Sequence, residues 1–483
     1  MPVRKAAAVT ALALLGGCSL SPAYREPAAT PVSAYQEAGE WLPARPADAE
    51  PRDDWWVRFG DPALNDLQGR LAAANPDLGA AVARFAQARA LALGARSDEF
   101  PSLAASAAAE RQRTSANAPA AKLIGGNAAL YNDFAAALGL SWEIDLFGRV
   151  RNTAAAARAQ AQASAADLAA VRLALQAQLA SSYFALQGDD AAIRLLEDTL
   201  TTYDRAFELT RNRYREGIAA ATDVDQADTQ RQNARAQLAA VRRERAQLEH
   251  ALAVLVGELP SSFTLPAHPL TAAPPPIDYV LPSTLLQRRP DVARAERLMA
   301  AANARVGVAR AAWFPVFSLS AATGFESTAA TTWLAAPSRL WSVGPQGELP
   351  LIDFGSRVAV NRQARAAFDE ALADYRKTTL TAYQEVEDSL AALHHTADEL
   401  AADAAAANSA ASSARHADER YAAGVADYVE VTTTHTAALQ AERAVISARV
   451  TELTAAVALV RACGGGWSRG DATLAARAPR SVP

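Results

Sequence analysis

Histidine and cysteine are the residues in this chain best suited to catalysis or metal binding, and the sequence holds six histidines and two cysteines. Zinc sites and general bases need such side chains, with suitable partners, at defined spacings. The histidines do not meet this requirement, and the sequence contains neither a phosphate-binding loop nor a nucleophile elbow. We therefore expect no catalytic residue, no metal site and no cofactor, and we expect the histidines on solvated helix faces. They are His250, His268, His394, His395, His416 and His435.

The amino terminus carries a different kind of signal. Arg4 and Lys5 precede an apolar run over residues 6–15. A run of this length cannot cross a hydrocarbon core of about 30 Å, and a charged stretch followed by a short apolar one is typical of a secretory signal peptide. We assign residues 1–17 to that signal.

Cys18 ends the leader in the sequence Leu15-Gly16-Gly17-Cys18, which resembles a bacterial lipobox. In a lipobox the cysteine becomes the lipidated first residue of the mature protein. Ser19 follows in place of aspartate, which by resemblance to bacterial lipoproteins implies sorting to the outer membrane. The other cysteine, Cys463, then has no partner for an intrachain disulfide, and we expect it to be a small buried helix residue.

Charge and hydropathy exclude further classes of function. The formal net charge is −5 and the sequence pI about 5.8, without a basic block, so nucleic acid is not an expected partner. Beyond the leader, the sequence has no run of 18 apolar residues. If the mature chain crosses a membrane by itself, it must do so with strands, because helices and closed barrels are the structures that satisfy backbone polar groups in lipid.

Four pairs of matching segments indicate an internal repeat. Two pairs are offset by 214 residues, as Pro101 is from Pro315, and two by 207 residues, as Gly148 is from Gly355. The seven-residue difference falls between Pro101 and Gly148. The pairs are Asn75-Pro76-Asp77-Leu78 with Arg289-Pro290-Asp291-Val292, Phe100-Pro101 with Phe314-Pro315, Asp145–Arg149 with Asp353–Gly355, and Arg213–Gly217 with Arg420–Gly424. The expected units are a lipidated extended segment at 18–57, a first repeat at 58–258, a proline-rich linker at 259–281, a second repeat at 282–467 and a disordered tail at 468–483.

Each repeat switches from helical to strand periodicity and back. Apolar residues occupy the even positions from Phe134 to Ile144 while polar residues take odd ones, and this alternation predicts a strand with one apolar face. Similar alternation follows Phe317 and Trp341, whereas residues 102–111 fit it less well. We expect one β-hairpin in each repeat, giving four strands per chain. The hairpins are expected at about 101–147 and 315–353.

Long helical hairpins follow the β-hairpins. Residues 149–213 contain no proline, and Gly188 is the interior glycine; as one helix this stretch would span about 98 Å. Apolar residues recur at intervals of seven, which predicts a coiled-coil seam. The chain turns at Gly217 and, in the second repeat, at Gly424, so we expect antiparallel helical hairpins at 148–258 and 355–464. The seam residues are Leu179, Leu186, Ile193, Leu200, Phe207 and Tyr214.

Four strands cannot form a closed barrel, and an open sheet would leave unpaired backbone groups in lipid. The barrel must then be shared between copies. Two copies give eight strands, whose bore side chains fill, whereas three give 12 and leave a passage. We expect a mixed α and β membrane protein, a trimeric 12-stranded β-barrel that continues into an antiparallel α-helical coiled-coil barrel. Trp142 and Trp341 are candidates for an aromatic belt at the membrane interface.

The ordered series of motifs resembles the TolC-type outer-membrane efflux proteins, and above all the OprM/NodT-like lipoprotein branch. The resemblance covers residues 18–467. Its motifs are the lipobox, Trp55-Trp56 with Gly60-Asp61-Pro62, Asn75–Leu78, Trp142–Arg149, Arg288–Asp291, Ala301–Gly307, Arg420–Gly424 and Gly464–Trp467. It implies a homotrimeric channel in the outer membrane that conducts small molecules such as drugs, without catalysis. The partners it implies are a periplasmic adaptor, an inner-membrane pump of the resistance-nodulation-division type and outer-membrane lipid.

In that family the helical turns close the periplasmic end with tyrosine, arginine and carboxylate contacts, which open like an iris. The candidates that this resemblance implies are Arg213, Tyr214, Gly217, Asp223, Arg420, Tyr421, Gly424, Asp427 and Glu430. Two positions depart from the family: Thr433 stands where relatives often have aspartate, and Ala426 where one branch has arginine. Asp427 and Glu430 are nearby acids that can substitute, and Gln226 occupies the Thr433 position of the first repeat.

Other interpretations stay open at this point. The long helices alone would also suit a periplasmic adaptor or scaffold, although four alternating strands with tryptophans speak against it. A duct for a type I protein-secretion system would have the same architecture. At the turns, the glycines can be simple helix C-caps, the tyrosines core residues, and the arginines cations that favour a helix C-terminus. The sequence does not name the substrate, since specificity is expected to lie in the pump.

Overall fold

The structure is a computed structural model that describes residues 21–24, 54–115, 130–274 and 289–465. The predicted signal peptide 1–17, the lipidation site Cys18 and the tail 468–483 lie outside the described residues, as do most of 18–57 and the end of the linker 259–281. The described residues form two compact units. One contains the described residues within 1–27, 85–164 and 295–375, and the other those within 28–84, 165–294 and 376–483.

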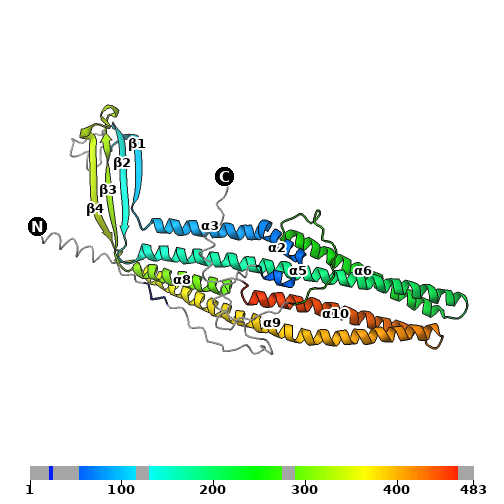
Figure 1. The fold of residues 1–483 in the computed structure, drawn as a ribbon. Helices are drawn as coiled ribbons and strands as arrows, with labels where there is room; N and C mark the ends of the chain where they lie inside the picture. Colours follow the sequence, from blue (N-terminus) through cyan, green and yellow to red (C-terminus); the bar gives the residue numbers. More distant parts are fainter. Residues whose placement is uncertain (1–20, 25–53, 116–129, 275–288, 466–483) are drawn as a thin grey trace. The chain divides into compact units, whose positions relative to one another are not determined.

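The first unit contains a four-stranded antiparallel sheet in the order β1-β2-β3-β4 (Figure 1). The prediction of four strands per chain is confirmed. The outer strands β1 and β4 pair on one side only, with β2 and β3 respectively, so each keeps one free edge. The strands are β1 (Ser102–Arg113), β2 (Leu130–Ile144), β3 (Val316–Ser327) and β4 (Arg339–Glu348), with two short 3-10 turns, η2 (Ala330–Thr332) and η3 (Ala336–Ser338), between the last two.

The strand register places the alternating side chains of the two repeats on common faces. Phe134 of β2 lies opposite Ser327 of β3, and Ile144 lies opposite Phe317, so the even residues of β2 share a face with the odd residues of β3. Trp341 of β4 joins that face opposite Thr323. The period-two pattern of the sequence therefore corresponds to one apolar face that runs across the sheet.

The first unit also explains the motif at 301–307, which lies on helix α8 (Pro290–Ala311). Asn303 donates from Nδ2 to the carbonyl of Pro22 at 3.0 Å, and the Tyr24 hydroxyl donates to Glu296 at 2.7 Å. A Cβ atom on Gly307 would lie 2.6 Å from the side-chain nitrogen of Asn152 and 2.9 Å from Ser21. The absence of a side chain at Gly307 and the amide of Asn303 therefore allow residues 21–24 to pack along α8.

In the second unit, Asp61 organises the start of the first repeat. The short helix η1 (Trp55–Phe59) ends at Gly60, whose φ is 66°, and α2 (Pro62–Ala74) begins with proline at its first position. One carboxylate oxygen of Asp61 accepts the backbone N–H groups of Ala63 and Leu64, at 2.9 and 3.2 Å. The other accepts the hydroxyl of Tyr183 at 2.8 Å, and burial together with this bond raises the pKa of Tyr183.

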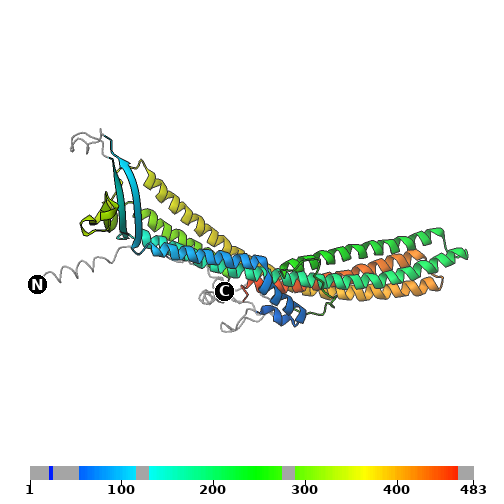
Figure 2. The same ribbon diagram turned by 90° about the horizontal axis from the view of Figure 1, so that it is seen from above.

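The helical hairpins of the two repeats have equal lengths. Helices α5 (Arg149–Arg215) and α9 (Ser356–Ala422) have 67 residues each, and α6 (Ala221–Leu255) and α10 (Tyr428–Ala462) have 35 each. Figure 1 shows α5 beside α6 and α9 beside α10, and Figure 2 shows the same four helices running alongside one another. The predicted continuous helix over 149–213 is confirmed. Within the described residues, no helix is both long and apolar enough to cross a membrane.

The predicted seam of α5 is buried along most of its length. Leu179 and Leu186 are fully buried, while Ile193, Leu200 and Phe207 are partly buried. Leu196 of α5, Leu238 of α6 and Leu439 of α10 belong to one buried apolar cluster, so the seam packs the two hairpins against each other. Tyr214 is the exception, since it remains 49% exposed in this chain.

Asn75 and Arg289 fasten the two repeats in the same way. The side chain of Asn75, which precedes α3 (Pro76–Ser97), donates to the carbonyl of Leu255 at 2.8 Å. Arg289, which precedes α8, donates to the carbonyl of Ala462 at 3.1 Å. The donors are offset by 214 residues and the acceptors by 207, the offsets of the sequence repeat. In both repeats a buried side chain thus donates a hydrogen bond to a backbone carbonyl at the end of the helical hairpin, where the helix itself supplies no partner.

The described part of the linker is held against the first hairpin. Arg245 of α6 donates to the carbonyl of Leu265 at 2.7 Å and pairs with Asp190 of α5 at 2.6 Å. The N–H of Leu265 donates to Glu249 at 2.7 Å, and that of His268 to Asp190 at 3.2 Å. The linker therefore follows a fixed path over these residues.

Candidate functional site

The turns that join the helices of each hairpin repeat one another bond by bond. Gly217 and Gly424 both have φ of 75°, a left-handed conformation that favours glycine. Ile218 donates its N–H to the carbonyl of Arg213 at 2.8 Å, and Val425 donates to that of Arg420 at 3.0 Å. These are glycine C-caps of the Schellman type. The structural interpretation of the two glycines is thus confirmed.

Arg213 of the first hairpin binds the end of the second. Its Nη1 and Nη2 donate to the carbonyls of Tyr421 and Ala422 at 3.0 and 3.1 Å. Its guanidinium carbon lies 4.7 Å from the centroid of the Tyr421 ring. The last carbonyls of a helix have no partner within it and carry partial negative charge, so a cation satisfies them well. The arginine therefore caps α9 and stacks on its tyrosine together.

Tyr421 packs inward between the hairpins. Its ring meets that of Tyr428 edge-on, with centroids 5.4 Å apart, and its hydroxyl lies 3.3 Å from that of Thr210. Tyr421 and Phe207 border a buried cluster, and burial raises the pKa of Tyr428 in it to about 12. The buried members are Ala227, Ala417, Tyr428 and Val431. The chain thus brings together Arg213 and Tyr421 of the predicted set.

The matching residues of the opposite repeat do not meet in this chain. Tyr214 is 49% exposed, and Arg420 turns to Glu430, with Nε 3.1 Å from the carboxylate. Asp223 accepts the N–H of Ala220 at 3.2 Å, and Asp427 caps α10 by accepting the N–H of Glu430 at 3.1 Å. The predicted acids therefore fix the starts of α6 and α10.

The positions that depart from the family pattern are also defined. Thr433 is exposed, and its hydroxyl donates to the carbonyl of Val429 at 2.8 Å within α10. Gln226, its counterpart, has a buried side-chain oxygen with no hydrogen-bond partner among the described residues. Ala426 lies in the turn before Asp427 and is partly exposed.

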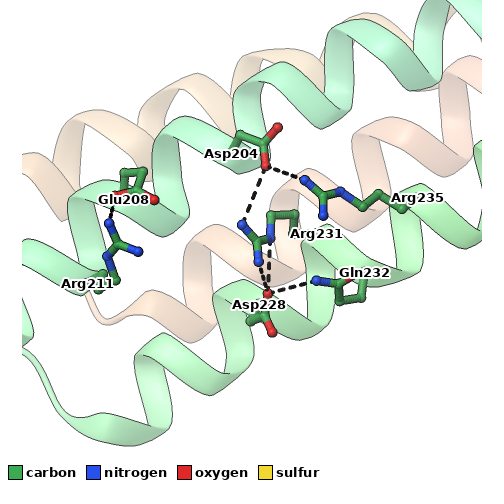
Figure 3. Close-up of polar contacts among 7 residues, drawn as sticks. All are labelled: Asp204, Glu208, Arg211, Asp228, Arg231, Gln232 and Arg235. Atoms are coloured by element: carbon green, nitrogen blue, oxygen red, sulfur yellow. Dashed lines mark hydrogen bonds and ion pairs between the residues drawn. The ribbon is translucent and has the colours of Figure 1, made fainter.

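Behind the first turn, charged side chains join α5 to α6 (Figure 3). Arg231 lies between two acids: Nη2 is 2.5 Å from Asp228 and Nη1 is 3.8 Å from Asp204. Arg235 also reaches Asp204, at 3.4 Å. The guanidinium of Arg231 lies 4.1 Å from the centroid of the Phe207 ring. This network was not predicted from the sequence, although the three-residue spacing of Asp228 and Arg231 on a helix is a signal for an ion pair.

Two further contacts complete the network. Arg211 of α5 pairs with Glu208 (Figure 3). Its guanidinium carbon lies 5.6 Å from the centroid of the Phe207 ring, so Arg211 and Arg231 contact this ring from two helices. Hydrogen bonds from Gln232 and Arg231 lower the pKa of Asp228. The buried cluster around Tyr421 and Phe207 is therefore bordered, on the Phe207 side, by this network of charged side chains.

Trp142 and Trp341 lie on one face of the sheet, toward opposite ends. Trp142 is opposite Leu319, and Trp341 is opposite Thr323, four residues further along β3. Trp142 donates from its ring to the carbonyl of Glu99 at 3.1 Å, whereas Trp341 is 73% exposed. The interface role of the two tryptophans remains a prediction.

A cluster of metal-capable groups in the described residues lies on α9. The potential ligand atoms of His394, His395 and Asp398 are within 4.8 Å of one another, and all three residues are exposed. Exposed groups of this kind are common on protein surfaces without a bound ion. His435 instead bonds Asp418 at 2.8 Å. The expectation of no metal site remains a prediction. Cys463, by contrast, is buried, as expected, and lies at the C-cap of α10.

The chain matches the family model described as "Outer membrane efflux protein" over residues 67–258 and 281–465. It is 35% identical to the toluene efflux pump outer membrane protein TtgC of Pseudomonas putida, over 95% of each chain. It is 32% identical to the outer membrane protein OprJ of Pseudomonas aeruginosa, over 97% of each chain.

Solved structures give the same result. The outer-membrane channel OprN is similar at a TM-score of 0.84 and 30% identity, covering 93% of this chain and all of its own. The CmeC outer membrane channel of Campylobacter jejuni has a TM-score of 0.86 at 25% identity, covering 95% of this chain and 97% of its own. The resemblance to TolC-type channels is therefore confirmed. The chain belongs to the outer membrane efflux protein family, and it is the outer-membrane channel of an efflux system, not an enzyme.

Proposed function

We propose that three copies of this chain form one conduit, a 12-stranded barrel in the outer membrane that continues into a helical barrel in the periplasm. The observation that carries this proposal is the four-stranded sheet with a free edge on β1 and on β4. Free edges in lipid would leave backbone groups unpaired, and three copies close the sheet with an open bore. Exposed apolar side chains on the sheet, such as Leu103, Leu138 and Val343, suit a lipid-facing wall.

The amino terminus adds a second attachment. Lipid on Cys18, after removal of residues 1–17, would hold each copy at the periplasmic side of the outer membrane through residues 18–57. The repeats 58–258 and 282–467 would each supply one β-hairpin and one helical hairpin, with the linker 259–281 between them. A trimer then has six similar hairpins in its helical wall.

The cargo that fits this channel is a small molecule. The relatives named above include a toluene efflux pump protein, and other similar proteins are named for solvent and antibiotic efflux. We propose that the cargo arrives from an inner-membrane pump of the resistance-nodulation-division type through a periplasmic adaptor. The proposed docking end is the pair of turns at Gly217 and Gly424.

The same turns would form the gate. Arg213 and Tyr421 hold the two hairpins of one copy together, while Arg420 and Tyr214 remain available to neighbouring copies. Asp427 and Glu430 place negative charge at the start of α10. In this proposal the contacts keep the free channel closed, and engagement with the adaptor and pump separates the hairpins.

Native mass spectrometry of the detergent-solubilised mature protein tests the assembly. The expected species is a trimer with lipid on each chain, and a Cys18→Ala variant should keep the trimer but lose the lipid mass. A single-copy species with no β-sheet signal in circular dichroism would contradict the barrel. For transport, a strain that lacks the gene should accumulate a fluorescent pump substrate and regain efflux on complementation. Defective protein secretion with unchanged small-molecule efflux would point to the export alternative.

A further inference from the structure

A groove between helices α8 and α9 (Ser356–Ala422) lies apart from the turns described above. Its volume is about 570 Å³, within the range of sites that bind small ligands. We call it the basic groove, because arginines from both helices line it. The lining residues that bear on its chemistry are Arg310, Trp313, Phe314, Asn361, Arg362 and Arg365. All of them belong to the first compact unit.

The basic groove adjoins the end of the sheet at which α8 and α9 attach. Helix α8 leads into β3, whose first residue Val316 lies opposite Glu348 at the end of β4, and β4 leads on to α9 (Figure 1). Arg310 is the last but one residue of α8, and Arg362 is the seventh of α9. At 1.5 Å per residue, both lie within about 10 Å of the helix ends that meet the sheet.

The packing of residues 21–24 identifies the side of α8 that carries the groove. Asn303 and Gly307 lie against these residues. Arg310 follows Gly307 by three positions, a spacing that keeps to one side of a helix. The first residue of the packed segment is three positions from Cys18, a span of at most about 11 Å. The lipid proposed on Cys18 would therefore be attached close to this side of the helix.

The two arginines of α9 line the groove without a counter-charge. Arg362 and Arg365 are exposed, and neither has an acidic partner among the described residues. Arg357 differs from them, because its Nε lies 2.5 Å from the carboxylate of Asp353 and its guanidinium carbon lies 5.0 Å from the centroid of the Trp313 ring. The positive charge of the groove therefore remains available to an anion from outside this chain.

The chemistry of the groove suits a phosphate that is attached to an apolar body. Guanidinium groups donate paired hydrogen bonds to phosphate oxygens, and the side-chain amide of Asn361 can donate another. Trp313 and Phe314 are 46% and 38% exposed, so they offer apolar surface beside these donors. Aromatic residues are enriched where a protein meets the membrane interface. A free phosphate would use the arginines but leave the aromatic surface in water, whereas a phospholipid would use both.

We infer that the basic groove binds the phosphate of an anionic phospholipid, of the phosphatidylglycerol class, on the periplasmic side of the outer membrane. Arg362 and Arg365 hold the phosphate, and Trp313 and Phe314 lie against the start of the acyl chains. Basic pockets beside membrane-spanning elements recognise lipid headgroups in this way. The inference rests on the outer-membrane barrel proposed above and adds a bound lipid to it. Such a lipid would fix the depth of the channel in the membrane together with the anchor at Cys18.

Native mass spectrometry of the delipidated full-length protein, with phosphatidylglycerol added back, tests the groove. The parent should retain this lipid in preference to phosphatidylcholine with the same acyl chains. Arg362→Gln combined with Arg365→Gln should weaken the retention roughly 30-fold, since each arginine near a lipid surface contributes about fivefold in affinity. The matched control is Arg305→Gln combined with Arg376→Gln. It removes two exposed charges from the same two helices outside the groove and should retain lipid like the parent.

A second variant tests the groove while both arginines stay in place. Asn361→Asp introduces a carboxylate of nearly the same size as the amide, next to Arg362 and Arg365, so the fold should be unchanged. The carboxylate competes with the phosphate for the guanidinium groups, and retention of phosphatidylglycerol should fall by about fivefold. Inorganic phosphate at millimolar concentration should not displace the lipid from the parent. Displacement to the level of the double glutamine variant would overturn the lipid assignment in favour of a free phosphate.

The same spectra separate this inference from the assembly itself. A trimer that retains phosphatidylglycerol equally in the parent, the double glutamine variant and the control would overturn the groove as the binding site. A trimer that retains phosphatidylcholine as well as phosphatidylglycerol would overturn recognition of the anionic lipid. Both results would leave the assembly intact. A single-copy protein would instead remove the barrel on which the inference rests.

Discussion

The guanidinium of Arg213 lies 4.7 Å from the centroid of the Tyr421 ring and donates to the carbonyl of the same residue at 3.0 Å. Arg213 belongs to the first hairpin and Tyr421 to the second. The offset of 207 relates this arginine to Arg420, and Tyr421 to Tyr214. The single chain makes one of the two junctions that the repeat allows, and the proposed trimer would make the other between copies.

The first prediction is that Arg213→Ala opens the gate proposed at the turns. It removes two hydrogen bonds to helix carbonyls and one stacked cation. A loss of about 2 kcal/mol per junction would shift a closed-to-open equilibrium by roughly 30-fold. We expect larger and more frequent conductance steps for the variant in planar bilayers. Arg215→Ala, which removes the same charge two residues away, is the matched control and should conduct like the parent protein. Equal conductance of Arg213→Ala and the parent would exclude this contact from the gate.

The second prediction concerns the acids at the start of α10. Asp427 caps the helix and Glu430 pairs with Arg420 at 3.1 Å, so the two have different roles. Glu430→Ala should raise conductance, because Arg420 loses the ion pair that positions it for the junction with Tyr214 of a neighbouring copy. Asp427→Ala should do so less specifically, because losing an N-cap costs about 1 kcal/mol of helix stability. Asp427→Ser, which keeps a capping oxygen, separates the two effects. If Asp427→Ser and Asp427→Ala conduct alike while both differ from the parent, the negative charge of Asp427 controls the gate, and its capping hydrogen bond does not.

The sequence was sufficient to predict elements whose signal is local. Alternation from Phe134 to Ile144 predicted a strand, and the continuous stretch over 149–213 predicted one helix; both are present. The glycine turns followed from residue type alone, because the left-handed conformation at Gly217 and Gly424 favours glycine. The repeat offsets agree with the strand register, since Ala107 opposite Ala136 in the first hairpin corresponds, 214 and 207 residues later, to Ala321 opposite Val343 in the second.

Contacts between elements could be predicted less well from the sequence. The pairing of Arg213 with Tyr421, and not with an acid, depends on where the α9 carbonyls end in space. The heptad pattern placed Tyr214 on the buried seam, yet it is exposed in the single chain, since the pattern does not state which partner covers each position. Asn75 and Arg289 both donate a hydrogen bond to the carbonyl at the end of their hairpin. Because one is an amide and the other a guanidinium, a comparison of residue types does not reveal this shared role.

The third prediction uses a partly buried acid on α5. Desolvation, with the nearby charges of Glu244 and Asp190, raises the pKa of Asp189 to about 6 from 3.8, despite Arg245. One of its oxygens is buried without a hydrogen-bond partner among the described residues. The folded state then binds more protons than the unfolded state between about pH 4 and 6, so this group's contribution to stability is lost as pH rises through 6.

Asp189→Asn should therefore stabilise the protein at pH 8, by about 1–2 kcal/mol after allowance for solvent screening, and the gain should vanish near pH 4. Thermal unfolding followed by circular dichroism from pH 4 to 8 measures the difference. Asp198→Asn, at an exposed position of the same helix, is the control. A difference between Asp189→Asn and the parent that does not change with pH would show that Asp189 carries no shifted titration.

The fourth prediction concerns Gly188, the interior glycine of α5. A Cβ atom at this position would lie 2.4 Å from Cγ2 of Val450 on α10, so the two helices are in close contact here. Alanine gains about 1 kcal/mol of helix propensity over glycine, but overpacking typically costs 1–3 kcal/mol, and at this distance we expect the cost to dominate. Gly188→Ala should lower the unfolding temperature of the assembled protein.

Two further variants separate this contact from a general effect of alanine. Gly69→Ala in α2, where no atom lies within 4 Å of the new Cβ, should raise stability by about 1 kcal/mol through helix propensity alone. Gly188→Ala combined with Val450→Ala should recover at least part of the loss, because the shortened side chain makes room for the new methyl group. A purely additive double variant would mean that the two side chains do not meet, and that glycine at 188 has another cause.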